Sequence, residues 1–146
     1  MVDPHDRTER FELIAACEPS ALVAHADEVV EDTTVEVLQV PTPQLVMQRV
    51  VEPVHHQPFN LGEVVVTAAE VALDGEQGFA MVPGKAEKPA LSGAVVDAAI
   101  ESGHPAAEAM IETLVTDATR REQTQREQWA RRKRTAVDFD EMEDHT

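Results

Sequence analysis

Hydrophobic and polar residues alternate most clearly between Gly62 and Val82. On one side of a period-2 strand lie Val65, Thr67, Ala69, Val71 and Leu73. Asp74-Gly75 then supplies a turn that tolerates positive φ, and residues 78–82 return as a second strand. The pattern predicts an antiparallel hairpin with a short glycine-containing loop.

Two further strand patterns precede this hairpin. The β-branched residues of 33–40 predict one strand, and residues 44–51 predict another with Leu45 and Met47 facing the core. Pro41 and Pro43 separate them, and proline cannot donate to a sheet ladder, so we expect an edge strand or a connection there. The sheet is therefore expected to have about four strands.

Short helices are predicted ahead of the sheet. Asp6 and Glu9 have the spacing of a capping box at the start of a first helix, which carries an apolar stripe. Pro19 suits the first position of a second helix that continues to about Val30.

Two helices are predicted after the sheet. The first runs from residue 87 or 88 to Ser102, with Gly103 suited to the position after its end. The second starts at His104-Pro105 and has apolar residues at a 3-4 spacing as far as Ala118. Beyond Thr119 only i,i+4 ion pairs support it, so we expect it to project from the body. The fold class is α+β: an antiparallel sheet flanked by short N-terminal helices and by C-terminal helices.

Length and charge bound the classes of protein. The chain has 146 residues, which fits one domain spanning 1–146, and a net charge of −16 from 28 acidic and 12 basic residues. Acid-rich surfaces stay soluble in a saline cytoplasm, so we interpret the charge as adaptation to a halophilic source rather than as mimicry of an acidic ligand.

The charge changes sign near the C-terminus. Residues 1–119 carry −16, residues 120–134 carry +5, and residues 135–146 carry −5. Nucleic-acid binding by the basic segment stays open as an alternative, but it has one aromatic residue and no groove-reading pattern. We therefore interpret residues 120–146 as an arm and hook for docking onto an acidic partner subunit, with Trp129, Phe139 and Met142 as apolar anchors.

Few residues suggest chemistry by themselves. Cys17 lies among apolar residues of the first helix and has no activating neighbour, so we expect a buried, inert thiol. His25 is expected at the edge of an apolar stripe. His55 and His56 are adjacent in an extended segment and would point to opposite sides, so we predict no metal site there, with a weak auxiliary site or a substrate contact as the alternative.

The turn Pro83-Gly84-Lys85 is the best candidate for a phosphate contact. It precedes a predicted helix, whose first N–H groups attract anions, and Lys85 adds a positive charge. It lacks the second glycine and the spacing of a P-loop, and Glu87 would oppose an anion. A plain turn is therefore the favoured interpretation.

The location follows from two absences in the sequence. No apolar run of about 18 residues is present, so no membrane span is expected. Residues 1–10 are charged, which argues against a secretion signal. We expect a cytoplasmic protein.

The order of motifs resembles one family. P-F-N-L-G-E at 58–63 is followed by a valine-rich strand, a D-G turn, G-F-A-M-V-P-G at 78–84 and an alanine-rich helix, and T-A-V-D-F-D-E-M closes the chain at 135–142. This order resembles the G subunit family (PhnG) of the bacterial carbon–phosphorus lyase system over nearly the whole chain. No single motif in it is specific for a mechanism.

The resemblance implies a function that the residues alone do not. Members of the family act with the H, I and L subunits to displace adenine from ATP by methylphosphonate, which gives α-D-ribose 1-methylphosphonate 5-triphosphate. The G, H, I and J subunits form a core complex, and J cleaves the carbon–phosphorus bond. The resemblance thus implies a multi-subunit transferase with ATP and methylphosphonate as substrates and no cofactor on this chain.

Within that family the chain is expected to shape or close a site. Its strong negative charge suits a triphosphate badly, so we expect the I subunit to hold most of the chemistry. The residues that we expect to line the site are Asn60, Glu63, Gly84 and Lys85. Two alternatives remain, namely a pure scaffold subunit and a nucleic-acid-associated regulator that uses the arm.

Overall fold

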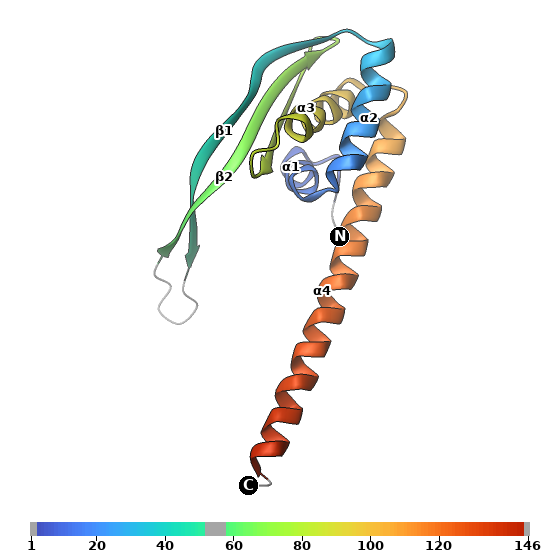
Figure 1. The fold of residues 1–146 in the computed structure, drawn as a ribbon. Coiled ribbons are helices and arrows are strands. Elements are labelled where there is room, and N and C mark those ends of the chain that lie inside the picture. Colours follow the sequence, from blue (N-terminus) through green and yellow to red (C-terminus); the bar gives the residue numbers. More distant parts are fainter. Residues whose placement is uncertain (1–2, 52–57, 145–146) are drawn as a thin grey trace.

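The computed structural model describes the backbone of residues 3–51 and 58–144 and the side chains of residues 3–47 and 62–134. Its elements are α1 (Arg7–Ala16), α2 (Pro19–Asp32), β1 (Val35–Val51), β2 (Pro58–Leu73), β3 (Glu76–Pro83), α3 (Glu87–Ser102) and α4 (Ala107–Asp144). The chain is an α+β fold, as predicted. The helices pack on one side of the sheet, and α4 extends far beyond the body (Figure 1).

The described sheet has three antiparallel strands in the order β1-β2-β3. β2 pairs with β3 from Leu73 opposite Glu76 to Val66 opposite Pro83, which confirms the predicted hairpin. β1 pairs with β2 along nearly its whole length. Because β3 ends first, β1 and β2 continue past it as a two-stranded ribbon (Figure 1).

The strand count differs from the expected four because residues 35–51 form one strand. The register of β1 against β2 shifts between Val37 and Gln39 and again between Gln39 and Thr42. These irregularities accommodate Pro41 and Pro43 on an edge strand, where a missing N–H costs no ladder hydrogen bond. The sequence predicted the edge position correctly and missed the continuity.

The core lies between the sheet and α3. The predicted face of β2 is buried at Thr67, Ala69, Val71 and Leu73. The expectation that Leu45 and Met47 face the core was wrong, since their exposed fractions are 66% and 53%. Leu45 pairs with Val65 and so shares the core face of the sheet, but it lies in the ribbon beyond the helices that cover that face.

Two glycines allow α3 to approach its neighbours closely. A Cβ added to Gly78 on β3 would lie 2.1 Å from the carbonyl oxygen of Ala94, and one added to Gly93 would lie 2.7 Å from Cγ2 of Ile14. No side chain fits at Gly78 without moving the helix backbone. Helix α3 is therefore enclosed by the sheet on one side and by α1 and α2 on the other.

Helix α4 begins two residues after the predicted Pro105. The ring Nδ1 of His104 accepts a hydrogen bond from the backbone N–H of Ala106 (3.0 Å), and the His104 carbonyl accepts one from Ala107 (2.9 Å). His104 therefore caps the helix. The helix then continues without a break to Asp144, so the residues predicted as a hook after the arm belong to the same helix.

Candidate functional site

The turn that carries Gly84 and Lys85 is held by one buried threonine. The hydroxyl of Thr67 on β2 donates to the carbonyl of Gly84 (2.6 Å) and accepts from the N–H of Ala86 (2.9 Å). Gly84 has a φ of +80° and donates to the carbonyl of Val65 (2.7 Å). The turn from β3 into α3 is thus fixed to the point where the ribbon leaves the body.

This geometry brings some of the expected lining residues into one region. Glu63 lies two residues along β2 from Val65, the hydrogen-bond partner of Gly84, and its side chain is exposed. Lys85 is also exposed. Asn60 lies in β2 with its backbone opposite Arg49, but its side chain lies outside the described residues. Glu63, Gly84 and Lys85 therefore lie around the base of the ribbon.

The start of α3 offers less to an anion than the sequence suggested. Ala86, at its N-cap, already donates its N–H to Thr67. Pro89 has no N–H to offer, and Glu87 places a negative charge in the first turn. The favoured interpretation of a plain turn agrees with this arrangement, in which Lys85 is the cationic group.

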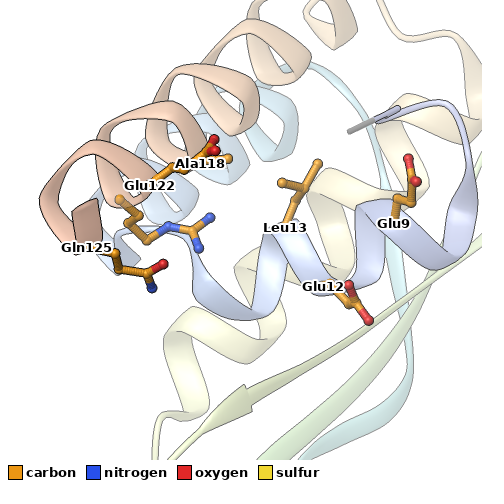
Figure 2. Close-up of a pocket in the computed structure, with 7 residues that line it drawn as sticks. Glu9, Glu12, Leu13, Ala118, Glu122 and Gln125 are labelled. Atoms are coloured by element: carbon orange, nitrogen blue, oxygen red, sulfur yellow. The ribbon is translucent and has the colours of Figure 1, made fainter. Parts of the chain in front are cut away.

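A hollow of about 300 Å³ lies between α1 and α4. Figure 2 shows Glu9 and Glu12 on α1 facing the side of Glu122 and Gln125 on α4. Arg121 also lines it. Three carboxylates against one guanidinium make this hollow negative, so its charge fits a cationic group and opposes a triphosphate.

Asp117 forms the polar base of α4 beside this hollow. Its carboxylate is buried and accepts from Nε of Arg121 (2.7 Å), from Nη2 of Arg120 (2.9 Å) and from the N–H of Glu18 (3.4 Å). The Nη2 of Arg121 is buried and has no hydrogen-bond partner among the described residues. These contacts connect the end of α1 to α4 at the point where α4 leaves the body.

A buried ionic cluster connects α1, α3 and β3. Nε of Arg10 donates to Oδ1 of Asp97 (2.7 Å), and Nη2 of Arg10 pairs with Glu101. Oδ2 of Asp97 accepts from Arg7 (3.1 Å) and from the N–H of Phe79 (3.0 Å). Burial lowers the pKa of Arg10, but its hydrogen bonds to Asp97 and Glu101 outweigh that effect and raise the pKa above its ordinary value. The cluster is internally satisfied, which fits a structural role.

The sequence analysis missed this cluster, although a signal was present. Asp97 is a single acid within the apolar run G-A-V-V-D-A-A-I, and Arg10 precedes a buried pair, Leu13 and Ile14. A lone charge on an apolar helix face is buried with a partner when the helix packs. The pairing itself, across 87 residues, is not visible in the sequence.

The other candidate residues occupy separate places. Cys17 is buried, and burial followed by the nearby Asp117 charge raises the pKa of its thiol to about 11, as an inert thiol requires. Nε2 of His25 contacts the hydroxyl of Thr113 (2.8 Å), at the edge of the α2 stripe. His55 and His56 lie outside the described residues. Among the described residues, no group of three or more potential metal ligands is gathered.

The expected docking residues lie on the arm. Trp129 is exposed by 66% on α4. Phe139 and Met142 lie on the same helix, and their side chains are outside the described residues. In the part of the chain that the structure describes, none of the helices has an apolar stretch long enough to cross a bilayer.

Comparison with known proteins adds one finding. The model of the family described as phosphonate metabolism protein PhnG matches residues 5–143. The match covers every described strand, α1 to α3, and α4 to within one residue of its end. No curated protein matches the chain.

Proposed function

Because the chain belongs to the PhnG family of phosphonate metabolism proteins, we propose that it is a subunit of the enzyme that makes α-D-ribose 1-methylphosphonate 5-triphosphate. In this reaction methylphosphonate displaces adenine from ATP. The partners are the carbon–phosphorus lyase subunits H, I, J and L, and the complex is cytoplasmic, where ATP is available. The family match over residues 5–143 is the observation that carries this proposal.

The charge of the chain supports an auxiliary rather than a solitary role. Displacement at the ribose C1 needs an acid on the leaving base, a positioned phosphonate oxygen and cations on the triphosphate. This chain has a net charge of −16, and the hollow between α1 and α4 is lined by Glu9, Glu12 and Glu122. We therefore assign the triphosphate contacts mainly to subunit I, while this chain shapes or closes the site and binds no cofactor.

Exposed apolar residues support membership in an assembly. On the ribbon and its base the structure exposes Val37, Leu38, Val40, Leu45, Met47 and Val64. Contiguous apolar surface of this kind is typical of an interaction site. Together with the projecting helix α4, it gives the chain two surfaces on which partner subunits can pack (Figure 1).

Within this proposal, Asn60, Glu63, Gly84 and Lys85 face the substrate from the base of the ribbon. The Thr67 hydrogen bonds hold the Gly84 turn rigidly beside β2, which suits a lining element. Lys85→Ala and Glu63→Ala should each lower phosphonate-dependent adenine release by about tenfold if they contact reacting groups or phosphates. Release at the wild-type rate in both variants would refute the lining role.

The proposal as a whole is tested by co-purification. The full chain and a variant truncated after Thr119 are co-expressed with subunits I and H in high salt. Adenine release from ATP is then measured with and without methylphosphonate. We expect a complex that forms with the full chain only and that releases adenine only when phosphonate is present.

The outcomes separate a synthase subunit from a scaffold. A complex of I and H that is equally active without this chain would refute a role in the reaction. Lost activity that returns when the I fold is secured by other means would indicate a scaffold. A matched control is Lys88→Ala, which removes one positive charge from the exposed first turn of α3 and leaves the Gly84 turn intact.

A further inference from the structure

The distal half of α4 carries two blocks of opposite charge along one continuous helix. Residues 120–134 have seven basic and two acidic residues, a net +5, and residues 135–146 have five acidic and no basic residues, a net −5. The helix runs to Asp144 and stands away from the rest of the chain (Figure 1). Within the described residues, neither block lies against another element of the body.

The acidic block is placed unfavourably for an isolated helix. The C-terminal end of a helix carries partial negative charge, so cations stabilise it and anions destabilise it. The last turn of α4 has no basic residue, while Glu141, Glu143 and Asp144 lie in the last four residues. A positively charged neighbour at this end would remove both the like-charge repulsion and the conflict with the helix dipole.

We propose that two copies of this chain associate through antiparallel pairing of their α4 arms. A two-fold axis beside Ala136 would place Arg132 opposite Asp140 and Arg134 opposite Asp138 of the second copy. The +5 block of each copy then faces the −5 block of the other. The small Ala136 on the axis allows the helices to approach, and the exposed Trp129 gains a surface that covers it.

A second copy fits these charges better than an unrelated acidic surface. An acidic partner would neutralise residues 120–134 and leave residues 135–146 repelled. Pairing about a two-fold axis satisfies both blocks with the same contact made twice, which is the isologous geometry of most dimers. Antiparallel helix dipoles also oppose each other favourably.

The length of the arm removes the main objection to self-association, which is repulsion between two acidic bodies. Residues 120–144 span about 37 Å at 1.5 Å per residue. Antiparallel arms place the two bodies at opposite ends of this span, beyond the screening length of about 8 Å at physiological ionic strength. Repulsion between the bodies is therefore small, whereas contact between the opposed charge blocks is short-ranged.

Sedimentation equilibrium of the full chain, near 0.05 M and near 0.5 M salt, tests the pairing. We expect a dimer whose dissociation constant rises at least about tenfold at the higher salt, because exposed ion pairs are screened. The variant Arg132→Glu with Arg134→Glu should be monomeric, and so should Asp138→Arg with Asp140→Arg. An equimolar mixture of the two variants should dimerise, because the reversed blocks again oppose each other. Circular dichroism checks that each variant keeps its helix content.

The matched control changes the same charge elsewhere. Lys85→Glu with Lys88→Glu also lowers the net charge by four but lies on the body, so dimerisation should persist. A full chain that stays monomeric at about 100 μM and low salt would overturn the inference. A control that weakens the dimer as much as the arm variant, or a mixture without rescue, would do the same.

Orientation is tested by cross-linking. When a chain with Arg132→Cys is mixed with a chain with Asp140→Cys, antiparallel pairing predicts a disulfide between positions 132 and 140. A predominance of 132–132 linkage would indicate parallel helices and overturn the geometry. The result is independent of the proposed function, since a monomeric chain in a complex that releases adenine would overturn only this inference.

Discussion

Nε of Arg10 donates to Oδ1 of Asp97 across 2.7 Å, and the exposed fractions of the two side chains are 1% and 4%. The contact joins α1 to α3 and so connects residues 87 positions apart. Asp97 also accepts from Phe79 on β3, so one carboxylate holds two helices and a strand. An ion pair at this depth is stable only while each of its charges keeps its partners.

Removing Asp97 should therefore destabilise the fold strongly. We expect Asp97→Ala to lower the free energy of unfolding by about 3–5 kcal/mol, because Arg10 is left as an uncompensated buried charge. Urea denaturation measures the change. The exposed Asp27→Ala on α2 is the control and should change stability by less than about 0.5 kcal/mol. The paired replacement Arg10→Met with Asp97→Leu should cost much less than the sum of the single changes, and an additive result would contradict the pairing.

Gly78 should tolerate no side chain. Gly78→Ala places a Cβ against the carbonyl oxygen of Ala94 and the backbone nitrogen of Ala98, so α3 must move as a whole. We expect a loss of about 3 kcal/mol or failure to fold. Gly93→Ala meets only the side-chain atoms of Ile14 and Ala80, which can adjust, so its loss should be about 1 kcal/mol. Thermal unfolding of both variants measures the order, and the reverse order would refute this account of the packing.

Thr67 should be needed for the turn that carries Lys85. Thr67→Val keeps the shape of the side chain but leaves the carbonyl of Gly84 and the N–H of Ala86 without their partner. We expect a loss of about 2 kcal/mol, measured by urea denaturation. Thr67→Ser keeps the hydroxyl and should retain both hydrogen bonds. Equal stability of the Val and Ser variants would show that the hydroxyl does not hold the turn.

Cys17 gives the fold a dependence on alkaline pH. Burial raises the pKa of its thiol to about 11, above the value near 8.5 expected in an unfolded chain. Because the folded-state pKa is the higher one, the contribution to stability is complete below about pH 8.5 and is lost as the pH rises through 11. The loss reaches about 3 kcal/mol at most.

Denaturation curves between pH 8 and 11 measure this loss. Cys17→Ala should lack the part of the decline that the thiol causes, whereas any decline from other groups stays. The native thiol should also react with iodoacetamide at pH 8 far more slowly than a free thiol, because it is both buried and protonated. Rapid alkylation of the folded protein would contradict the buried position.

His104 should act as the cap of α4 in its neutral form. Nδ1 accepts from Ala106, so the proton lies on Nε2, which faces Oδ1 of Asp32 at 3.2 Å. We expect His104→Ala to cost about 1 kcal/mol and His104→Asn to recover most of it, since asparagine is a good capping residue. Chemical denaturation measures both variants. Equal losses would show that packing rather than capping explains the effect.

Much of the fold follows from local patterns in the sequence. The period-2 run into Leu73, the Asp74-Gly75 turn and the return to Val82 predicted the β2–β3 hairpin. The positive φ of Gly103 at 72° matches the predicted end of α3. The loss of the apolar stripe after Thr119 predicted a projecting helix. These features depend on neighbours in the chain, which the sequence displays directly.

The candidate site was predictable only in part. Gly84 and Lys85 were recognised from a turn followed by a helix start, and Glu63 from the motif at the start of the strand. Their common position at the base of the ribbon depends on Thr67 and on the antiparallel register, which no local pattern contains. The sequence also could not show that Pro89 and the Ala86–Thr67 hydrogen bond leave the start of α3 few free donors.

The sequence by itself determined the elements, their order and the charge of each segment, because periodicity, turn residues and composition act over a few residues. Only the tertiary structure decided that β1 is one strand, that Leu45 and Met47 lie beyond the covering helices, and that Arg10 meets Asp97. Each of these depends on where one element ends relative to another in space. Such distances are set by packing across the whole core, where residues 87 positions apart compete for the same buried volume.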